Sequence, residues 1–185
     1  MTKHNENNVP VQHEGIPSPW ICRYAQLIRS GGQVLDLACG NGRHTRWLAA
    51  KNWRVSAVDR DAAALDELQQ VPNVSTLVAD LESDVWPYSG HRFDGIVVSR
   101  YLHRPLMPRL IESLHAGGVL IYETYMNGNE RFGRPKNPDF LLRSNELLEV
   151  FFPHLTVIAF QQGEFQEPAP SVIQRICAVS ESRNN

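Results

Sequence analysis

Three aspartates and one glycine turn are the residues of this sequence whose types and spacing could do chemistry. Asp36 lies inside an apolar segment, and four positions later the chain reaches the turn Gly40–Gly42. Because glycine has no Cβ atom, such a turn can be sharp and lets a ligand approach the backbone closely. Asp59 and Asp80 each lie at the end of a later apolar segment. Like charges repel, so the three carboxylates favour a non-phosphorylated nucleoside with a cationic centre over a bare phosphate.

These residues must be positioned by alternating strands and helices. Apolar segments predict strands at residues 33–39, 55–59, 74–80, 93–99 and 119–125. Helical spacing of apolar residues predicts helices at residues 20–28, 43–51, 62–70, 106–115 and 145–152. Such an alternation indicates βαβ units and a parallel sheet, with the ligand outside the carboxyl ends of the strands. Two last strands at 155–160 and 173–179, joined through Pro168–Pro170 without a helical pattern, are expected to pair antiparallel.

Length and composition narrow the class of protein. The 185 residues predict a flexible tail over residues 1–15 and a single domain over residues 16–185. A net charge of −2 argues against extended nucleic-acid binding. Neither a metal site nor a disulfide framework is expected, because Cys22, Cys39 and Cys177 lie far apart. With no signal-peptide or membrane-spanning pattern, we expect a cytoplasmic protein without a membrane partner, either a monomer or a homodimer.

Three short motifs resemble those of the class I S-adenosylmethionine-dependent methyltransferases. They are Asp-Leu-Ala-Cys-Gly-Asn-Gly at residues 36–42, Val-Asp-Arg-Asp at 58–61 and Ala-Asp-Leu at 79–81. The resemblance covers roughly residues 20–179 and, more weakly, is to small bacterial enzymes of the tellurite-resistance-like type. It implies an α/β fold of three αβα layers, Rossmann-like and doubly wound. The sheet would have seven mostly parallel strands, with the last inserted antiparallel between the fifth and sixth.

The resemblance also implies S-adenosylmethionine as the cofactor and a place for each part of it. The turn from Asp36 to Gly42 would contact the methionine moiety, Asp59 the ribose, and Asp80 with the Leu81 backbone the adenine. The full set of expected cofactor-binding residues is Asp36, Ala38, Cys39, Gly40, Asn41, Gly42, Asp59, Arg60, Asp80, Leu81 and Ser99.

Two other functions remain open beside methyl transfer. A nicotinamide oxidoreductase also carries G-x-G after its first strand, but Thr45 replaces the third glycine, and Asp36 would repel a pyrophosphate. A non-catalytic module that binds S-adenosylmethionine is the second alternative. Each aspartate could instead cap a strand-to-helix connection, and Cys39 could be a small buried filler.

Residues 99–104 follow the fourth predicted strand, where the transferring methyl should project. The Asn/Asp-Pro-Pro-Tyr-like element of many amino-group methyltransferases is absent there, which argues against methylation of nucleic-acid bases. His103 could be a general base because its ordinary pKa lies near neutrality, or it could cap the following helix. Tyr101 could be catalytic or a packing residue.

Residues 126–143 form a long polar excursion that could be a lid or a solvated loop. As a lid it would present cations to an anionic group on a small-molecule acceptor with an O, S or N nucleophile. The candidate substrate residues are Arg100, Tyr122, Arg131 and Arg134. An RNA acceptor remains conceivable through these arginines, although no separate RNA-binding domain is evident.

Overall fold

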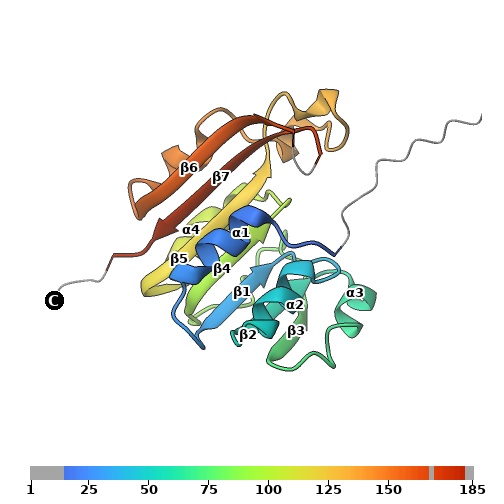
Figure 1. The fold of residues 1–185 in the computed structure, drawn as a ribbon, viewed down its shortest axis with the longest axis vertical. Helices are drawn as coiled ribbons and strands as arrows, with labels where there is room; N and C mark the ends of the chain where they lie inside the picture. Colours follow the sequence, from blue (N-terminus) through green and yellow to red (C-terminus); the bar gives the residue numbers. More distant parts are fainter. Residues whose placement is uncertain (1–14, 167–168, 182–185) are drawn as a thin grey trace, which may run out of the picture.

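A seven-stranded sheet organises the computed structural model, which describes residues 15–166 and 169–181 (Figure 1). The strand order is β3-β2-β1-β4-β5-β7-β6. The strands are β1 (Gln33–Leu37), β2 (Arg54–Asp59), β3 (Val74–Val78), β4 (Phe93–Ser99), β5 (Leu114–Tyr125), β6 (Thr156–Phe165) and β7 (Ser171–Val179). Strand β7 runs antiparallel to both of its neighbours, as the family resemblance implied, and the other strand pairs are parallel. The tail expected before Gly15 and the residue Pro168 lie outside the described residues.

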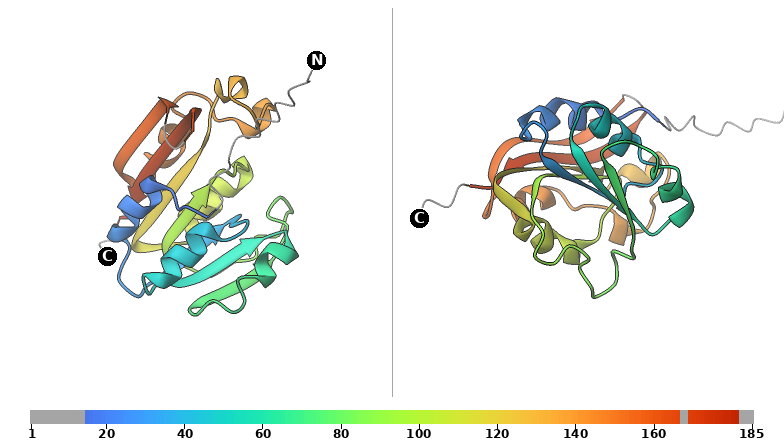
Figure 2. Two further views of the ribbon diagram at one scale, coloured as in Figure 1. Left: turned by 45° about the vertical axis from the view of Figure 1, so that its right-hand side comes forward. Right: turned by 90° about the horizontal axis from the view of Figure 1, so that it is seen from below.

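Helices cover both faces of this sheet and complete the three expected layers (Figure 2). The helices are α1 (Pro19–Tyr24), α2 (Arg43–Ala50), α3 (Ala62–Asp66), α4 (Met107–Glu112) and α5 (Glu146–Phe151). Helices α1 and α2 pack through Ile21 and Leu48 in one hydrophobic cluster, and α4 and α5 pack through Leu110 and Phe151 in the other. Strands β1 and β4 are apolar on both sides because each side faces one of these clusters.

Several element bounds differ from the sequence prediction. The helix expected at 106–115 ends at Glu112, because Leu114 already pairs with Phe93 and begins β5 ahead of a register shift. The helix expected at 62–70 ends at Asp66, and the one expected at 20–28 becomes 3₁₀ after Tyr24. Strand β6 continues to Phe165 through its pairing with β7. In the described part of the chain, no helix has both the length and the apolar character needed to cross a membrane.

Candidate functional site

A cavity of about 410 Å³ opens at the carboxyl ends of β1, β2, β3, β4 and β5, where an open α/β sheet places its ligand. Residues from the ends of these strands and from the excursion after β5 line it. They are Ala38, Asp59, Arg60, Ala79, Asp80, Leu81, Glu82, Arg100, Tyr101, Leu102, Thr124, Tyr125, Pro135 and Phe140. Seven of the predicted site residues therefore meet in one cavity: Ala38, Asp59, Arg60, Asp80, Leu81, Arg100 and Tyr101.

Asp59 ends β2 and ties the glycine turn to the second strand. Its Oδ2 accepts the Gly40 backbone N–H at 2.8 Å, and its Oδ1 accepts the Asp61 N–H at 3.0 Å. A carboxylate offers about four lone-pair sites, so roughly two remain for a ligand. Asp80 keeps more of its capacity, because its side chain accepts one bond, from the Glu82 N–H. Two carboxylates with unused acceptor sites in one cavity suit a ligand with hydroxyl and amino donors.

Asp36, expected to contact the ligand, is not among the residues that line this cavity. Its side chain is 1% exposed and accepts the Thr45 Oγ1–H at 2.5 Å, beneath the glycine turn. Burial raises the pKa of Asp36 to about 6, while hydrogen bonds from Thr45 and the charge of Arg43 act in the opposite direction. Through the bond from Thr45, Asp36 connects the strand β1 to the start of α2.

The glycine turn is fixed by backbone conformation and by close packing. Ala38, Gly40 and Gly42 all have positive φ, of 52°, 53° and 73°. Gly42 also lies directly against the buried Leu68 of the α3 connection, where a Cβ atom would come within 2.5 Å of a Leu68 methyl. Cys39 is half-buried against a small cluster of Ala57, Leu65 and Leu68, in agreement with its reading as a filler. Of the turn residues from Cys39 to Gly42, none lines the cavity.

The first two residues of α2 hold the segment that enters α1. Arg43 donates to the Ile16 carbonyl at 3.3 Å and to Ser99 Oγ at 3.1 Å. His44 Nε2 accepts the Ser18 backbone N–H at 3.1 Å, which requires a neutral imidazole. Burial and the positive charges of Arg43 and Arg100 lower the pKa of His44 to about 3. Ser99 thus contacts Arg43 and does not line the cavity.

Tyr101 brings an unpaired hydroxyl to the cavity. Its side-chain oxygen is buried and has no hydrogen-bond partner among the described residues. Burial, followed by the negative charges of Glu82 and Asp80, raises the pKa of this phenol. A buried hydroxyl without a partner is costly, so this oxygen fits a ligand polar group better than an empty site.

Some of the residues predicted for catalysis and substrate binding line the cavity, and others do not. Arg100 lines the cavity, and Arg131 and Arg134 do not. Arg131 pairs with Glu164 at 2.5 Å and lies over the Phe132 ring. Tyr122 is 2% exposed and donates its hydroxyl to the Tyr101 carbonyl at 2.9 Å, so it belongs to the core.

The structure contradicts the capping role that His103 could have had. His103 directly precedes the 3₁₀ helix η2 (Arg104–Leu106), but its side chain makes no capping hydrogen bond. It is also absent from the cavity wall.

Sequence reasoning missed the residues that close the far end of the cavity. Thr124 and Tyr125 end β5, two and three positions beyond the predicted Tyr122. Pro135 and Phe140 come from the excursion at 126–143, of which only the cations were predicted to contact a ligand. The excursion therefore contributes apolar side chains to the cavity lining.

Known sequences resemble this chain in part. Residues 34–117 match a protein-family model described as a methyltransferase domain. The trans-aconitate 2-methyltransferase of Paracidovorax citrulli is 31% identical over 112 residues, which cover 56% of this chain and 42% of that protein. An uncharacterized protein of Schizosaccharomyces pombe is 22% identical over 182 residues, covering 72% of this chain and 54% of that protein. The chain thus spans about half the length of these curated relatives.

Solved structures share the fold over most of the chain. TehB from Haemophilus influenzae matches with a TM-score of 0.70 at 19% identity, over 87% of this chain and 61% of that chain. The N-methyltransferase NodS from Bradyrhizobium japonicum, in complex with S-adenosylhomocysteine, matches with a TM-score of 0.65 at 18% identity, over 96% and 94%. At such identities the likeness shows the fold, which is that expected from the sequence motifs.

Proposed function

We propose that this chain is a class I S-adenosylmethionine-dependent methyltransferase and that it methylates a small anionic acceptor. Its match to a methyltransferase domain model and its fold support the first part. One observation carries the proposal: a single cavity joins the carboxylates Asp59 and Asp80 to the cation Arg100. The carboxylates suit an adenosine, and the cation suits an acceptor of opposite charge. The cavity lies within the range of volumes that hold small molecules.

The residues of the cavity fit the cofactor by their hydrogen-bonding capacity. Asp59 would accept ribose hydroxyls, and Asp80 would accept the adenine amino group. S-adenosylmethionine supplies a methyl group already activated by a positive sulfur. The protein then needs to align the acceptor and to exclude water, and the apolar side chains of Pro135 and Phe140 in the cavity lining suit the second task.

The charge balance around Arg100 supports an anionic acceptor. Arg100 leaves β4 in a left-handed conformation with φ of 56°, and its backbone N–H donates to the Glu123 carbonyl. Neither Arg100 nor the neighbouring Arg43 forms an ion pair with another described residue. Burial and the charge of Arg100 lower the pKa of the Arg43 guanidinium, so a nearby anion would be stabilising. The relative named as a trans-aconitate methyltransferase points to the same chemistry, because aconitate is a carboxylate.

We expect S-adenosylhomocysteine to bind the wild-type protein with an affinity on the order of micromolar and Asp59→Asn to weaken it about 10- to 100-fold. The amide keeps the shape of the side chain but loses the charge that strengthens bonds from ribose hydroxyls. Isothermal titration calorimetry measures both affinities, with Asp94→Asn, remote from the cavity, as a matched control. Wild-type protein that binds neither S-adenosylmethionine nor S-adenosylhomocysteine would refute the proposal.

For the acceptor, labelled S-adenosylmethionine is incubated with a metabolite extract, and the products are separated by anion exchange. We expect label in the retained fraction. With the purified acceptor, Arg100→Gln should lower kcat/KM about 10- to 100-fold and change the affinity for S-adenosylhomocysteine less than about twofold.

Arg134→Gln, in the excursion at 126–143 and outside the cavity lining, is the control and should resemble wild type. A large loss of S-adenosylhomocysteine affinity in Arg100→Gln would assign this cation to the cofactor and contradict its role toward the acceptor.

The absence of His103 from the cavity wall favours one alternative, a module that binds the cofactor without turnover. The same labelling experiment separates the two functions, since a binding module transfers no label to any fraction.

A further inference from the structure

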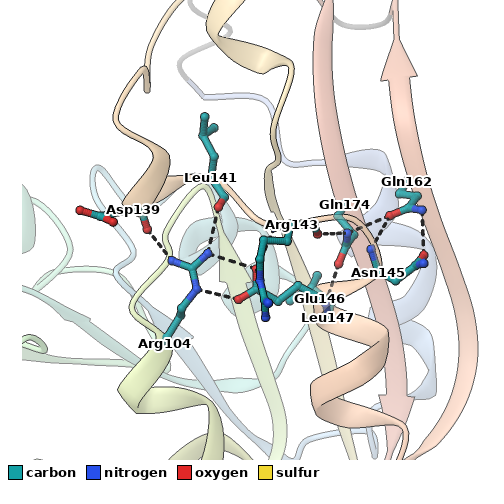
Figure 3. Close-up of polar contacts among 9 residues, drawn as sticks. All are labelled: Arg104, Asp139, Leu141, Arg143, Asn145, Glu146, Leu147, Gln162 and Gln174. Carbon is teal, nitrogen blue, oxygen red and sulfur yellow. Dashed lines mark hydrogen bonds and ion pairs between the residues drawn. The ribbon is translucent and has the colours of Figure 1, made fainter.

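Arg104, which does not line the cavity, contacts the cover of the cavity, by which we mean the excursion residues Pro135 to Leu141 around the lining side chains. Arg104, in η2, donates through Nη1 to the Asp139 carbonyl at 2.7 Å and through Nη2 to the Leu141 carbonyl at 2.9 Å (Figure 3). These two carbonyls flank Phe140, the residue of the 3₁₀ helix η4 (Pro138–Phe140) that lines the cavity. A planar guanidinium with several fixed donors is suited to bridging two such acceptors.

The other side of the same guanidinium is fixed by a buried carboxylate. Arg104 Nε donates to Glu146 Oε1 at 2.6 Å, and Nη2 donates to Oε2 at 3.1 Å. The Glu146 residue is 1% exposed, and its Oε2 also accepts the Arg143 backbone N–H at 2.8 Å. Burial alone would raise the pKa of Glu146, but the bonds from Arg104 and Arg143 outweigh it and hold this pKa below its ordinary value. The carboxylate is therefore charged and keeps the guanidinium in one orientation.

A second buried side chain, Gln174, connects the segment around Glu146 to the sheet. Gln174 of β7 is fully buried, and its Oε1 accepts the Leu147 backbone N–H at the start of α5. Its Nε2 donates to the Arg143 carbonyl at 3.0 Å and to Gln162 Oε1 at 2.9 Å (Figure 3). The segment from Arg143 to Leu147 is thereby tied to β6 and β7. Arg104 connects this segment to the cavity residues 100–102, which lie just before η2 in the chain.

We infer that Arg104 is a positioning residue, which holds Phe140 over the acceptor end of the cavity. The inference rests on the proposed function. Arg104 directly follows the segment that supplies Arg100, Tyr101 and Leu102 to one wall, and its bonds reach the residues on both sides of Phe140 in the other. Arg104 therefore links the two walls directly, in addition to the backbone bonds that join Leu142 to Tyr125 and Asn127. It touches neither ligand, and its effect on the reaction passes through Phe140.

The test uses Arg104→Lys, which keeps the positive charge beside Glu146 but cannot bridge both carbonyls and the carboxylate with a single nitrogen. Arg109→Lys is the matched control, because Arg109 forms an exposed pair with Glu112 on α4. Hydrogen–deuterium exchange is measured for peptides covering residues 138–142. We expect exchange there to be about tenfold faster in Arg104→Lys and unchanged in Arg109→Lys.

A second readout separates positioning from general support of the fold. Dissociation of S-adenosylhomocysteine is followed by stopped flow in Arg104→Lys, in Phe140→Ala and in the double variant. We expect each single change to speed dissociation several-fold and Arg104→Lys to add nothing once Phe140 is alanine.

The inference would be overturned if residues 138–142 exchanged in Arg104→Lys as slowly as in the wild-type protein. It would also be overturned if Arg104→Lys sped dissociation equally in the presence of Phe140 and of its alanine substitute. If the wild-type protein did not bind S-adenosylhomocysteine, the proposed function would fail, whereas the exchange measurement would still decide whether Arg104 holds the cover.

Discussion

Replacing Gly42 with alanine is expected to destabilise the protein by about 2 to 5 kcal/mol. Two costs add at this position. The φ of 73° lies in the left-handed region, where a Cβ atom costs about 1 to 2 kcal/mol. The new methyl would also meet the side chain of the buried Leu68, and such overpacking costs about 1 to 3 kcal/mol.

Gly40→Ala is the matched control for this prediction. Gly40 has a similar φ of 53°, but a Cβ atom there would have no neighbour within 4 Å. It should therefore show the conformational cost alone, about 1 to 2 kcal/mol. Urea unfolding measures both free energies, and equal losses in the two variants would contradict the packing argument against Leu68.

The second large effect concerns the pH dependence of stability. The pKa of Asp36 is raised from 3.8 to about 6 in the folded protein, because burial disfavours the carboxylate. Between these two values the folded state binds more protons than the unfolded state, so stability falls as the pH rises. We expect wild type to lose on the order of 2 to 3 kcal/mol between pH 4 and 7 relative to Asp36→Asn. The asparagine still offers Thr45 a carbonyl oxygen.

Wild type must be compared with Asp36→Asn because His44 changes the pH dependence of stability in the opposite direction. Its pKa is lowered from 6.5 to about 3, so the unfolded state binds more protons between these values and stability rises with pH. The two contributions offset each other in the wild-type profile. Unfolding free energies measured from pH 4 to 8 for both proteins isolate Asp36, and parallel profiles would contradict the prediction.

The order of the strands followed from sequence motifs more readily than their bounds did. Alternating apolar strands and helices predict a parallel sheet, and the resemblance placed the last strand between its two predecessors. The early start of β5 could not be foreseen, because it depends on pairing between Leu114 and Phe93 after a shift of register. Polar residues such as His115 give no strand signal, and tertiary pairing overrides the helical pattern.

Within the site, the sequence predicted which strand ends meet but not how deep each side chain lies. Tyr122 and Thr124 lie on the same face of β5, yet only Thr124 reaches the cavity, since Tyr122 is one step further inside. The burial of Asp36 was likewise not apparent from its place in the motif. Contacts between distant segments leave no local pattern at all, and Arg104 and Glu146 are separated by 42 positions.

The insertion of β7 between β5 and β6 has a consequence for the order in which the protein becomes complete as it is synthesised. Strands β1 to β4, with the glycine turn, Asp59 and Asp80, precede the cover of the cavity in the chain, and domains assemble from segments already released by the ribosome. The support of the cover depends on Gln174, which belongs to β7 and emerges after everything it holds. Because a domain generally folds as a unit, the support that Gln174 gives to residues 143–147 can form only once β7 has been synthesised and has entered the sheet.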